Sequence, residues 1–193
     1  MNFSKEDTIS YVAILVIIVS MASIGMQFTG HAVTNEAVVN VTVSESAAIN
    51  FTVALVEFGS GSVNNGSAGA TLETGSAPVE GTWEGTKGAL TLENIGNVNV
   101  TLNLSANEAA QVYLGGTDPL FQYKVTDNDP NACGDVAGTY ANFTTGVGAL
   151  VCSPLNYADA SDKINIDIKL YIPSDSNTGT QTATITATGT ATS

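Results

Sequence analysis

The residues best suited to chemistry form one short run, DNDPN, that begins at Asp127. Asp127, Asp129 and Asn131 stand at alternate positions, the spacing at which a loop presents oxygen ligands to a hard cation such as Ca²⁺. The run departs from an EF-hand loop, because Ala132 stands at position six and Gly138 at position twelve. Asp, Asn and Pro are also ordinary turn residues. The pattern therefore indicates either a calcium site or a plain turn held by a disulfide.

Cys133 and Cys152 are the only cysteines of the chain. In an oxidising compartment two cysteines most simply form one disulfide. It would close a loop of about 20 residues, worth on the order of 3 kcal/mol in the chain-entropy model. The alternatives are two free thiols or half of a zinc site, but zinc needs more nitrogen or sulfur ligands than His31, the only histidine, supplies. We expect the disulfide.

No enzymatic site stands out. His31, the only histidine, precedes the predicted domain. The domain therefore cannot contain a Ser-His or Cys-His nucleophile or a zinc site built on histidine. There is no HExxH motif and no phosphate-binding loop. A carboxylate pair could hydrolyse glycosides, but the sixteen acids that follow the N-terminal segment (eighteen less Glu6 and Asp7) offer no basis for choosing one. Trp83, the only tryptophan, could stack on a sugar, although a lone Trp in a β domain is more often part of the core.

Six Asn-x-Ser/Thr sequons are candidates for glycosylation, which requires export and a competent host. They begin at Asn40, Asn50, Asn65, Asn99, Asn103 and Asn142. The chain is rich in Asn, Ser and Thr, so some sequons arise by chance. The pattern is compatible with a sugar-coated surface protein and with solvent-facing strand residues alike.

The N-terminal segment predicts a membrane anchor. Residues 9–28, ISYVAILVIIVSMASIGMQF, contain no charge, and a helix of that length spans about 30 Å, the thickness of the bilayer core. A cleaved signal peptide has a more basic start and a shorter core, although small residues near Ser23 and Gly30 leave cleavage open. We expect residues 1–8 in the cytoplasm, a transmembrane helix or uncleaved signal anchor over 9–28, and a linker over 29–36.

Charge sets the predicted orientation. Lys5 precedes the apolar segment, no other Lys or Arg occurs before Lys87, and Glu36 and Glu45 follow the segment. The positive-inside rule therefore predicts a single-pass protein of the cell membrane, with its N-terminus cytoplasmic, its C-terminal domain extracellular and membrane lipid around its helix. The formal net charge of −13 argues against nucleic acid as a partner and against docking on anionic lipid. It favours solubility and mutual repulsion at a crowded surface.

Alternating apolar residues predict strands throughout residues 37–193. They occur at 39–43, 49–56, 90–92, 98–104, 121–125, 164–172 and 180–192. We expect 90–92 to form a hairpin with 98–104, and 164–172 with 180–192. Residues 59–77 and 126–153 look like loops, and 106–113 could form one helical turn or a crossover. The fold class is therefore all-β: a jelly-roll or Ig-like β-sandwich ectodomain preceded by one transmembrane α-helix.

Three stretches carry a resemblance to a known class of protein: FGSGSV from Phe58, LTLENIGNVNV from Leu90, and IPSD from Ile172 with its Thr-rich sequel. Over residues 36–193 the chain resembles archaeal surface proteins with one N-terminal membrane segment and a β-sandwich. It is more distantly similar to camelysin-related fibre proteins and archaeal bundling pilins. The resemblance implies a jelly roll and, in the fibre-forming relatives, polymerisation by donor-strand exchange. The chain differs in its long apolar segment, in lacking a Lys/Arg-Gly cleavage signal, and in lacking metal ligands for the peptidase activity described for camelysin.

If the protein polymerises, residues 37–43, AVVNVTV, are the predicted donor. A sandwich that lacks one strand leaves backbone groups and apolar pockets open. Val39, Val41 and Val43 of a neighbour would fill those pockets by β-augmentation, and such a head-to-tail contact propagates. The simpler alternative is that the segment pairs within its own sandwich and the protein stays monomeric.

We therefore expect a non-enzymatic cell-surface protein with a structural or adhesive role in the cell envelope. One alternative is a subunit of an extracellular filament assembled by donor-strand exchange, and another is a carbohydrate-binding module or glycosidase. The expected partners besides lipid are a second copy of the chain or envelope glycans. No cofactor is predicted apart from the calcium candidate.

Overall fold

The computed structural model describes residues 40–136 and 138–192. The chain divides into two compact units, Met1–Thr42 and Val43–Ser193. Of the first unit only residues 40–42 are described, and they are exposed and belong to no strand. The predicted cytoplasmic segment, transmembrane helix and linker lie outside the described residues. Among the residues described, no helix is long and apolar enough to cross a membrane.

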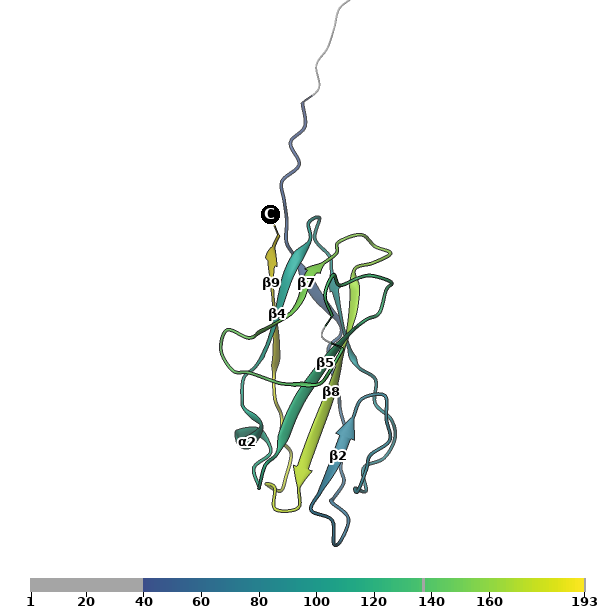
Figure 1. Cartoon of the computed structure of the whole chain (residues 1–193), viewed down its shortest axis with the longest axis vertical. Helices are drawn as coiled ribbons and strands as arrows, with labels where there is room; N and C mark the ends of the chain where they lie inside the picture. Colours follow the sequence, from purple (N-terminus) through teal and green to yellow (C-terminus); the bar gives the residue numbers. More distant parts are fainter. Residues whose placement is uncertain (1–39, 137, 193) are drawn as a thin grey trace, which may run out of the picture. The chain divides into compact units, whose positions relative to one another are not determined.

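The second unit is all-β, as expected, with two antiparallel sheets and one short helix (Figure 1). The six-stranded sheet has the spatial order β1 (Ile49–Val53), β3 (Leu90–Asn94), β8 (Lys163–Pro173), β5 (Leu120–Asp127) and β6 (Ala141–Asn142), and β2 (Gly69–Glu73) pairs with the C-terminal half of β8. The three-stranded sheet has the order β7 (Ala149–Leu155), β4 (Val100–Ala106) and β9 (Ile185–Ala191). Helix α2 (Ala110–Tyr113) is the predicted single turn after β4.

Strand alternation builds the core. Every second residue of β4 is fully buried, and the same is true of β8 from Ile164 to Leu170. Successive side chains of a strand point to opposite faces, so one face of each sheet supplies the core and the other meets solvent. The apolar faces predicted at 98–104 and 164–172 are confirmed.

The predicted hairpin between 90–92 and 98–104 is wrong, because β3 and β4 belong to different sheets. A hairpin would place both apolar faces on one side of one sheet, whereas a crossing lets them oppose each other across the core. The side chain of Asn94, 1% exposed, holds this crossing. Its Nδ2 donates to the Val98 and Leu155 carbonyls at 2.9 and 3.3 Å, and its Oδ1 accepts from the Gly96 N–H at 3.1 Å.

The second predicted hairpin is wrong for the same reason, because β8 lies in the six-stranded sheet and β9 in the three-stranded sheet. Strand β2 lies within the predicted loop 59–77, β6 lies within the predicted loop 126–153, and β7 begins in that loop and ends two residues after it. The predicted strand at 39–43 is not seen in its described part, because residues 40–43 belong to no strand. The expected apolar face of 49–56 ends early: the register shifts after Phe51, and Val53 and Leu55 are exposed.

We expect Asn94→Ala to destabilise the domain by about 2–3 kcal/mol, because it leaves buried backbone partners without hydrogen bonds. Urea unfolding of the purified domain, residues 43–193, measures this. Asn128→Ala is the matched control, since it removes one exposed hydrogen bond to Asn165 and should change the free energy of unfolding by less than about 0.5 kcal/mol. Equal losses in the two variants would contradict the role given to Asn94.

Candidate functional site

An apolar groove opens where the two sheets separate. Near the end of β9 the sheets lie close together, because a Cβ on Gly189 would stand 3.1 Å from Ile49 Cγ2. Toward the start of β9 they diverge and enclose a groove of about 240 Å³. Its walls come from the inner face of the six-stranded sheet, the segment after β1, the residues around the start of β9, and α2. The side chains are Phe51, Ala54, Leu55, Val56, Phe58, Leu90, Tyr113, Phe121, Ile168, Leu170, Ala183, Thr184 and Ile185.

The side chains that line the groove are apolar apart from Thr184 and the Tyr113 hydroxyl, although polar atoms also contribute substantially to its surface. Leu55 is 72% exposed beside it, and Val53 just before it is also exposed. In the groove wall Tyr113 packs on Phe121, with ring centroids 5.0 Å apart, and burial raises the pKa of the Tyr113 phenol. Exposed apolar side chains gathered at a recess mark interaction sites more often than chance surface residues do.

Strand β9 forms one side of this groove and has an unprotected edge. It pairs with β4 over seven residues without a register shift, and in the described part of the chain no strand pairs with its other edge. It contains no Pro and no charged residue. The remaining outer strands are protected in the usual ways: β7 carries Pro154 and two register shifts, β1 has a register shift, and β6 is two residues long.

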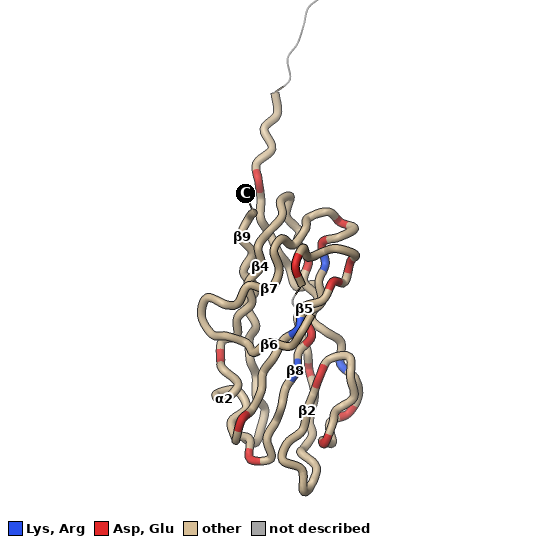
Figure 2. Tube along the Cα trace, in the orientation of Figure 1, with Lys and Arg blue, Asp and Glu red and all other residues tan. Residues whose placement is uncertain are grey.

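The three-stranded sheet as a whole is uncharged. None of β4, β7 and β9 contains Asp, Glu, Lys or Arg, and Figure 2 shows the charges elsewhere on the domain. Three of the four described lysines, Lys124, Lys163 and Lys169, lie on the six-stranded sheet, and Lys87 lies outside the strands. An apolar strand that binds at the groove and at the free edge of β9 would therefore not have to displace water from a charged side chain of this sheet.

The predicted donor residues are available to a partner as far as they are described. Val41 and Val43 are 85% and 78% exposed and pair with no strand of the described domain, while Val39 lies outside the described residues. The chain is held from Ser44 onward, because Asn97 donates through Nδ2 to the Ser44 carbonyl at 2.9 Å and exchanges hydrogen bonds with Ser46. The pairing of this segment within its own sandwich, the simpler expectation, is not present in residues 40–43.

The calcium candidates lie in a turn that uses some of their polar groups internally, while Asp129 Oδ2 is buried without a hydrogen-bond partner among the described residues. Asp127 Oδ1 accepts from the Cys133 N–H at 2.9 Å, and Asp129 Oδ2 lies 3.8 Å from Lys163 Nζ. The Asn131 carbonyl accepts from Asn156 Nδ2 at 2.8 Å. These contacts are what a plain turn requires, and calcium binding here stays a prediction.

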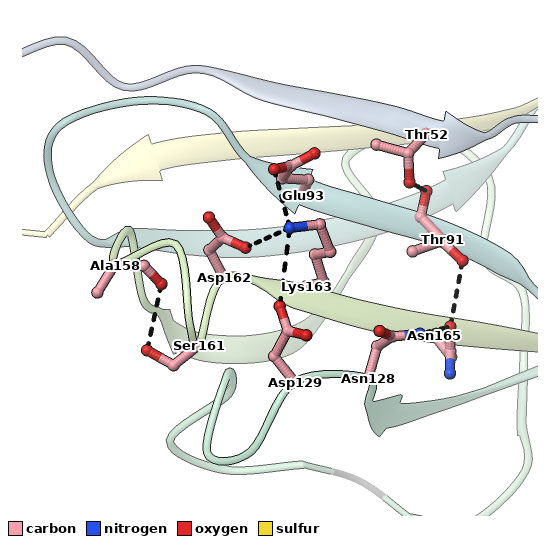
Figure 3. A network of polar contacts seen from close by, with 10 residues as sticks. All are labelled: Thr52, Thr91, Glu93, Asn128, Asp129, Ala158, Ser161, Asp162, Lys163 and Asn165. Carbon is pink, nitrogen blue, oxygen red and sulfur yellow. Dashed lines mark hydrogen bonds and ion pairs between the residues drawn. The ribbon is translucent and has the colours of Figure 1, made fainter.

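Lys163 lies among three carboxylates, those of Glu93, Asp129 and Asp162, at this end of the sheet (Figure 3). Oxygens of Glu93, Asp159 and Asp162 lie within 4.8 Å of one another. Lys163 Nζ lies 3.0 Å from Glu93 and 3.1 Å from Asp162. The hydrogen bonds that Lys163 donates to Glu93 and to Asp162 raise the pKa of Lys163. The ammonium thus compensates the acids where β3 and β8 run side by side.

A second polar cluster, made of Tyr140, Lys124, Lys169, Glu73 and Asp167, covers the six-stranded sheet. The ammonium groups of Lys124 and Lys169 each lie 4.9 Å from the centre of the Tyr140 ring. The Tyr140 hydroxyl donates to Glu73 at 2.8 Å, and the lysines pair with Asp167 and Glu73 at 3.3 and 3.4 Å. Burial, and then the bond to Glu73, raise the pKa of Tyr140. The cluster ties the loop before β6 to three strands, and its charges are paired.

The remaining candidates are distributed over the surface. Trp83 is half-buried and lies over Gly61 and Gly81, where a Cβ would come within 3 Å of its ring. This is a packing contact, as expected for a lone tryptophan. Among the sequons, the exposed asparagines are Asn40, Asn50, Asn65 and Asn142, and the half-buried ones are Asn99 and Asn103.

The Cys133–Cys152 disulfide is present and ties the turn at 127–135 to β7. Both sulfur-bearing side chains are buried. We expect Cys133→Ser combined with Cys152→Ser to lower the free energy of unfolding by about 3 kcal/mol, as loop closure over this length predicts. Urea unfolding of wild type and variant measures it, and an unchanged midpoint would show that the disulfide adds nothing to stability.

The ion pairs of Lys163 predict a pH dependence. Because its pKa is raised above the ordinary 10.5, the stabilisation is complete below pH 10.5 and is lost as the pH rises through the higher folded-state value. We expect Lys163→Met to be less stable than wild type at neutral pH, and this difference to shrink above pH 10.5. Urea midpoints from pH 6 to 11.5 test it. Lys87→Met is the control, since Lys87 has no ion pair among the described residues, and an identical profile for both variants would contradict the assignment.

Comparison of the chain with protein-family models, with curated proteins and with solved structures gives no match. The candidate site therefore rests on its own geometry. That geometry combines an apolar groove, an unprotected strand edge beside it, and exposed valines just before the domain.

Proposed function

We propose that this chain is a non-enzymatic structural protein of the cell surface that polymerises by strand exchange. Residues 37–43 of one copy would pair with the free edge of β9 of the next copy. The observation that carries the proposal is the groove of about 240 Å³ beside that edge, lined by Phe51, Leu55 and Phe58 among others. A strand added next to β9 would lie over this groove.

The donor segment matches the acceptor in length and pattern. Residues 37–43 and β9 are both seven residues long. Val39, Val41 and Val43 repeat every second residue, so in a strand they share one face and stand about 6.8 Å apart. Full burial of a valine side chain is worth about 1.5–3 kcal/mol. Three such side chains, together with the backbone ladder, supply the free energy for a contact between copies.

The contact is head-to-tail, because the donor segment and the acceptor edge are different surfaces of the same chain. Such contacts generate open filaments rather than closed dimers. Assembly also requires release from the membrane, since a retained anchor would keep the donor beside the bilayer. Processing near Ser23 or Gly30 would provide that release.

The finer points of architecture belong to the same proposal. We take the domain to be a jelly-roll or Ig-like sandwich, because its crossings from β3 to β4 and from β8 to β9 join the two sheets as such folds do. It would lie outside the cell, with the predicted helix over 9–28 as its anchor or its export signal. Adhesion to envelope glycans would be a property of the assembled surface.

We expect Val41→Asp to abolish filaments, because it places a carboxylate in the apolar groove of the neighbour. The assay is electron microscopy of material released from cells that make the protein, with the monomer's fold checked by retention of its disulfide. Thr42→Asp is the matched control. It adds the same charge one position away, on the opposite face of the donor strand, and should leave filaments intact.

Disulfide cross-linking of the same released material tests whether the groove is the acceptor. Val41→Cys combined with Leu55→Cys should give a ladder of disulfide-linked multimers on a non-reducing gel, while each single variant stops at a dimer. Filaments that persist in Val41→Asp would contradict the assigned donor. A wild-type protein that is released as a monomer and forms no filaments would overturn the proposed function.

A further inference from the structure

We propose that this chain is modified with N-linked oligosaccharides after its sandwich has folded. The occupied sequons are those at Asn40, Asn50, Asn65 and Asn142, and those at Asn99 and Asn103 stay free. The inference rests on the exported location in the proposed function, because the modification takes place on exported chains. It is independent of polymerisation.

Four sequons lie in or directly beside a strand, and in each the apolar middle residue points inward. They are those at Asn50, Asn99, Asn103 and Asn142. Val100 and Leu104 are fully buried, Phe143 is buried, and Phe51 lines the groove. Because side chains alternate along a strand, the Asn and the hydroxyl residue of each sequon share the outward face. A sugar on any of these asparagines would leave the core untouched, so the core does not decide which sequons are used.

Backbone pairing separates the six sequons into two classes. Asn40 and Asn65 lie outside the strands, and Asn50 and Asn142 lie in β1 and β6, the two outermost strands of the six-stranded sheet. Outer strands have backbone groups that no neighbour occupies. A transferase that must hold the backbone of a sequon can therefore approach these four sites on the folded domain. At two of them the hydroxyl must first leave an exposed hydrogen bond, because Thr52 Oγ1 donates to the Thr91 carbonyl at 3.4 Å and Ser67 Oγ donates to Glu80.

The other two sequons lie on a central strand whose two edges are both paired with neighbouring strands. Asn99 directly precedes β4 and Asn103 lies within it, and β4 is the central strand of its sheet, paired with β7 on one side and β9 on the other. Both asparagines are half-buried, and Asn103 Oδ1 is enclosed without a hydrogen-bond partner among the described residues. The backbone at Asn99 is also engaged, because its carbonyl accepts from Thr192 at 2.9 Å. Access here would require a sheet to open.

The chemistry needs a lipid-linked oligosaccharide as donor. The asparagine Nδ2 forms a bond to C1 of the first sugar, and the bond between C1 and the phosphate oxygen of the lipid carrier breaks. The electron pair leaves with the phosphate, and the amide nitrogen gives up one proton to a base of the transferase. The side chain must therefore present a free Nδ2. Asn142 satisfies this, because its recorded hydrogen bond uses Oδ1, which accepts from Gln122 at 2.9 Å.

The assigned sites are compatible with strand exchange. In a donor strand Asn40 and Thr42 face away from Val39, Val41 and Val43, so a sugar at Asn40 projects from the outer surface. Asn50 and Thr52 are exposed, whereas Phe51 between them lines the groove. Sugars at both positions therefore surround the proposed junction without entering it.

The test is glycopeptide mass spectrometry on the full chain purified from the cells that naturally make it. Removing all four accessible sequons with Thr42→Val, Thr52→Val, Ser67→Ala and Thr144→Val should abolish the sugar mass. The matched control, Thr101→Val with Ser105→Ala, removes both central-strand sequons and should leave the sugar mass unchanged. Both variants keep every asparagine, and retention of the disulfide reports folding.

Sugar confined to the four accessible sites supports the inference. Sugar on Asn99 or Asn103, or a chain without any sugar, overturns it. If the chain carries no sugar, protease added to intact cells shows whether the modification alone or the exported location has failed. A chain that is cleaved from outside but carries no sugar contradicts the modification alone, whereas a chain protected until lysis contradicts the exported location itself.

Discussion

The buried amide of Asn94 is the contact on which the arrangement of the sandwich depends. It lies at the end of β3, bonds to the backbone of the crossing that leads into β4, and reaches the Leu155 carbonyl at the end of β7. One side chain therefore connects both sheets at the point where the chain passes between them. A buried polar group must find partners or lose stability, so this geometry favours the crossing over a local hairpin.

The two sheets differ in size, and the groove follows from that difference. Strand β8 is eleven residues long and supports β3, β5 and β2, whereas the opposing sheet has three strands of seven residues. Three strands do not cover the inner face of six. The part left over shows Phe121, Ile168 and Leu170 to the groove. The recess is thus a property of sheet sizes and not of any single side chain.

The sequence predicts the apolar faces of single strands, which depend on neighbouring residues, but not the pairing of strands that are distant in the sequence. The apolar faces of β4, β5 and β8 follow from alternation, which any window of a few residues reveals. Which sheet each strand joins depends on pairing between distant segments, so both hairpins were wrong. Strand β2, GATLE, and most of strand β7 lie in stretches where turn-forming residues outnumber apolar ones, and such a composition predicts loops. Alternation points to the valines at 41 and 43 as donor candidates, which stays a prediction, and the groove has no sequence signal beyond the Thr/Ala repeat of β9.

The absence of charge from the three-stranded sheet has a consequence for the behaviour of any polymer built on it. A junction made of backbone hydrogen bonds and valine side chains contains no ion pair for dissolved salt to screen. The acidic chain, with its formal net charge of −13, would keep neighbouring fibres apart only within about a Debye length, roughly 10 Å at 0.1 M ionic strength and 3 Å at 1 M. Ionic strength would therefore change how closely fibres approach one another while leaving each fibre whole.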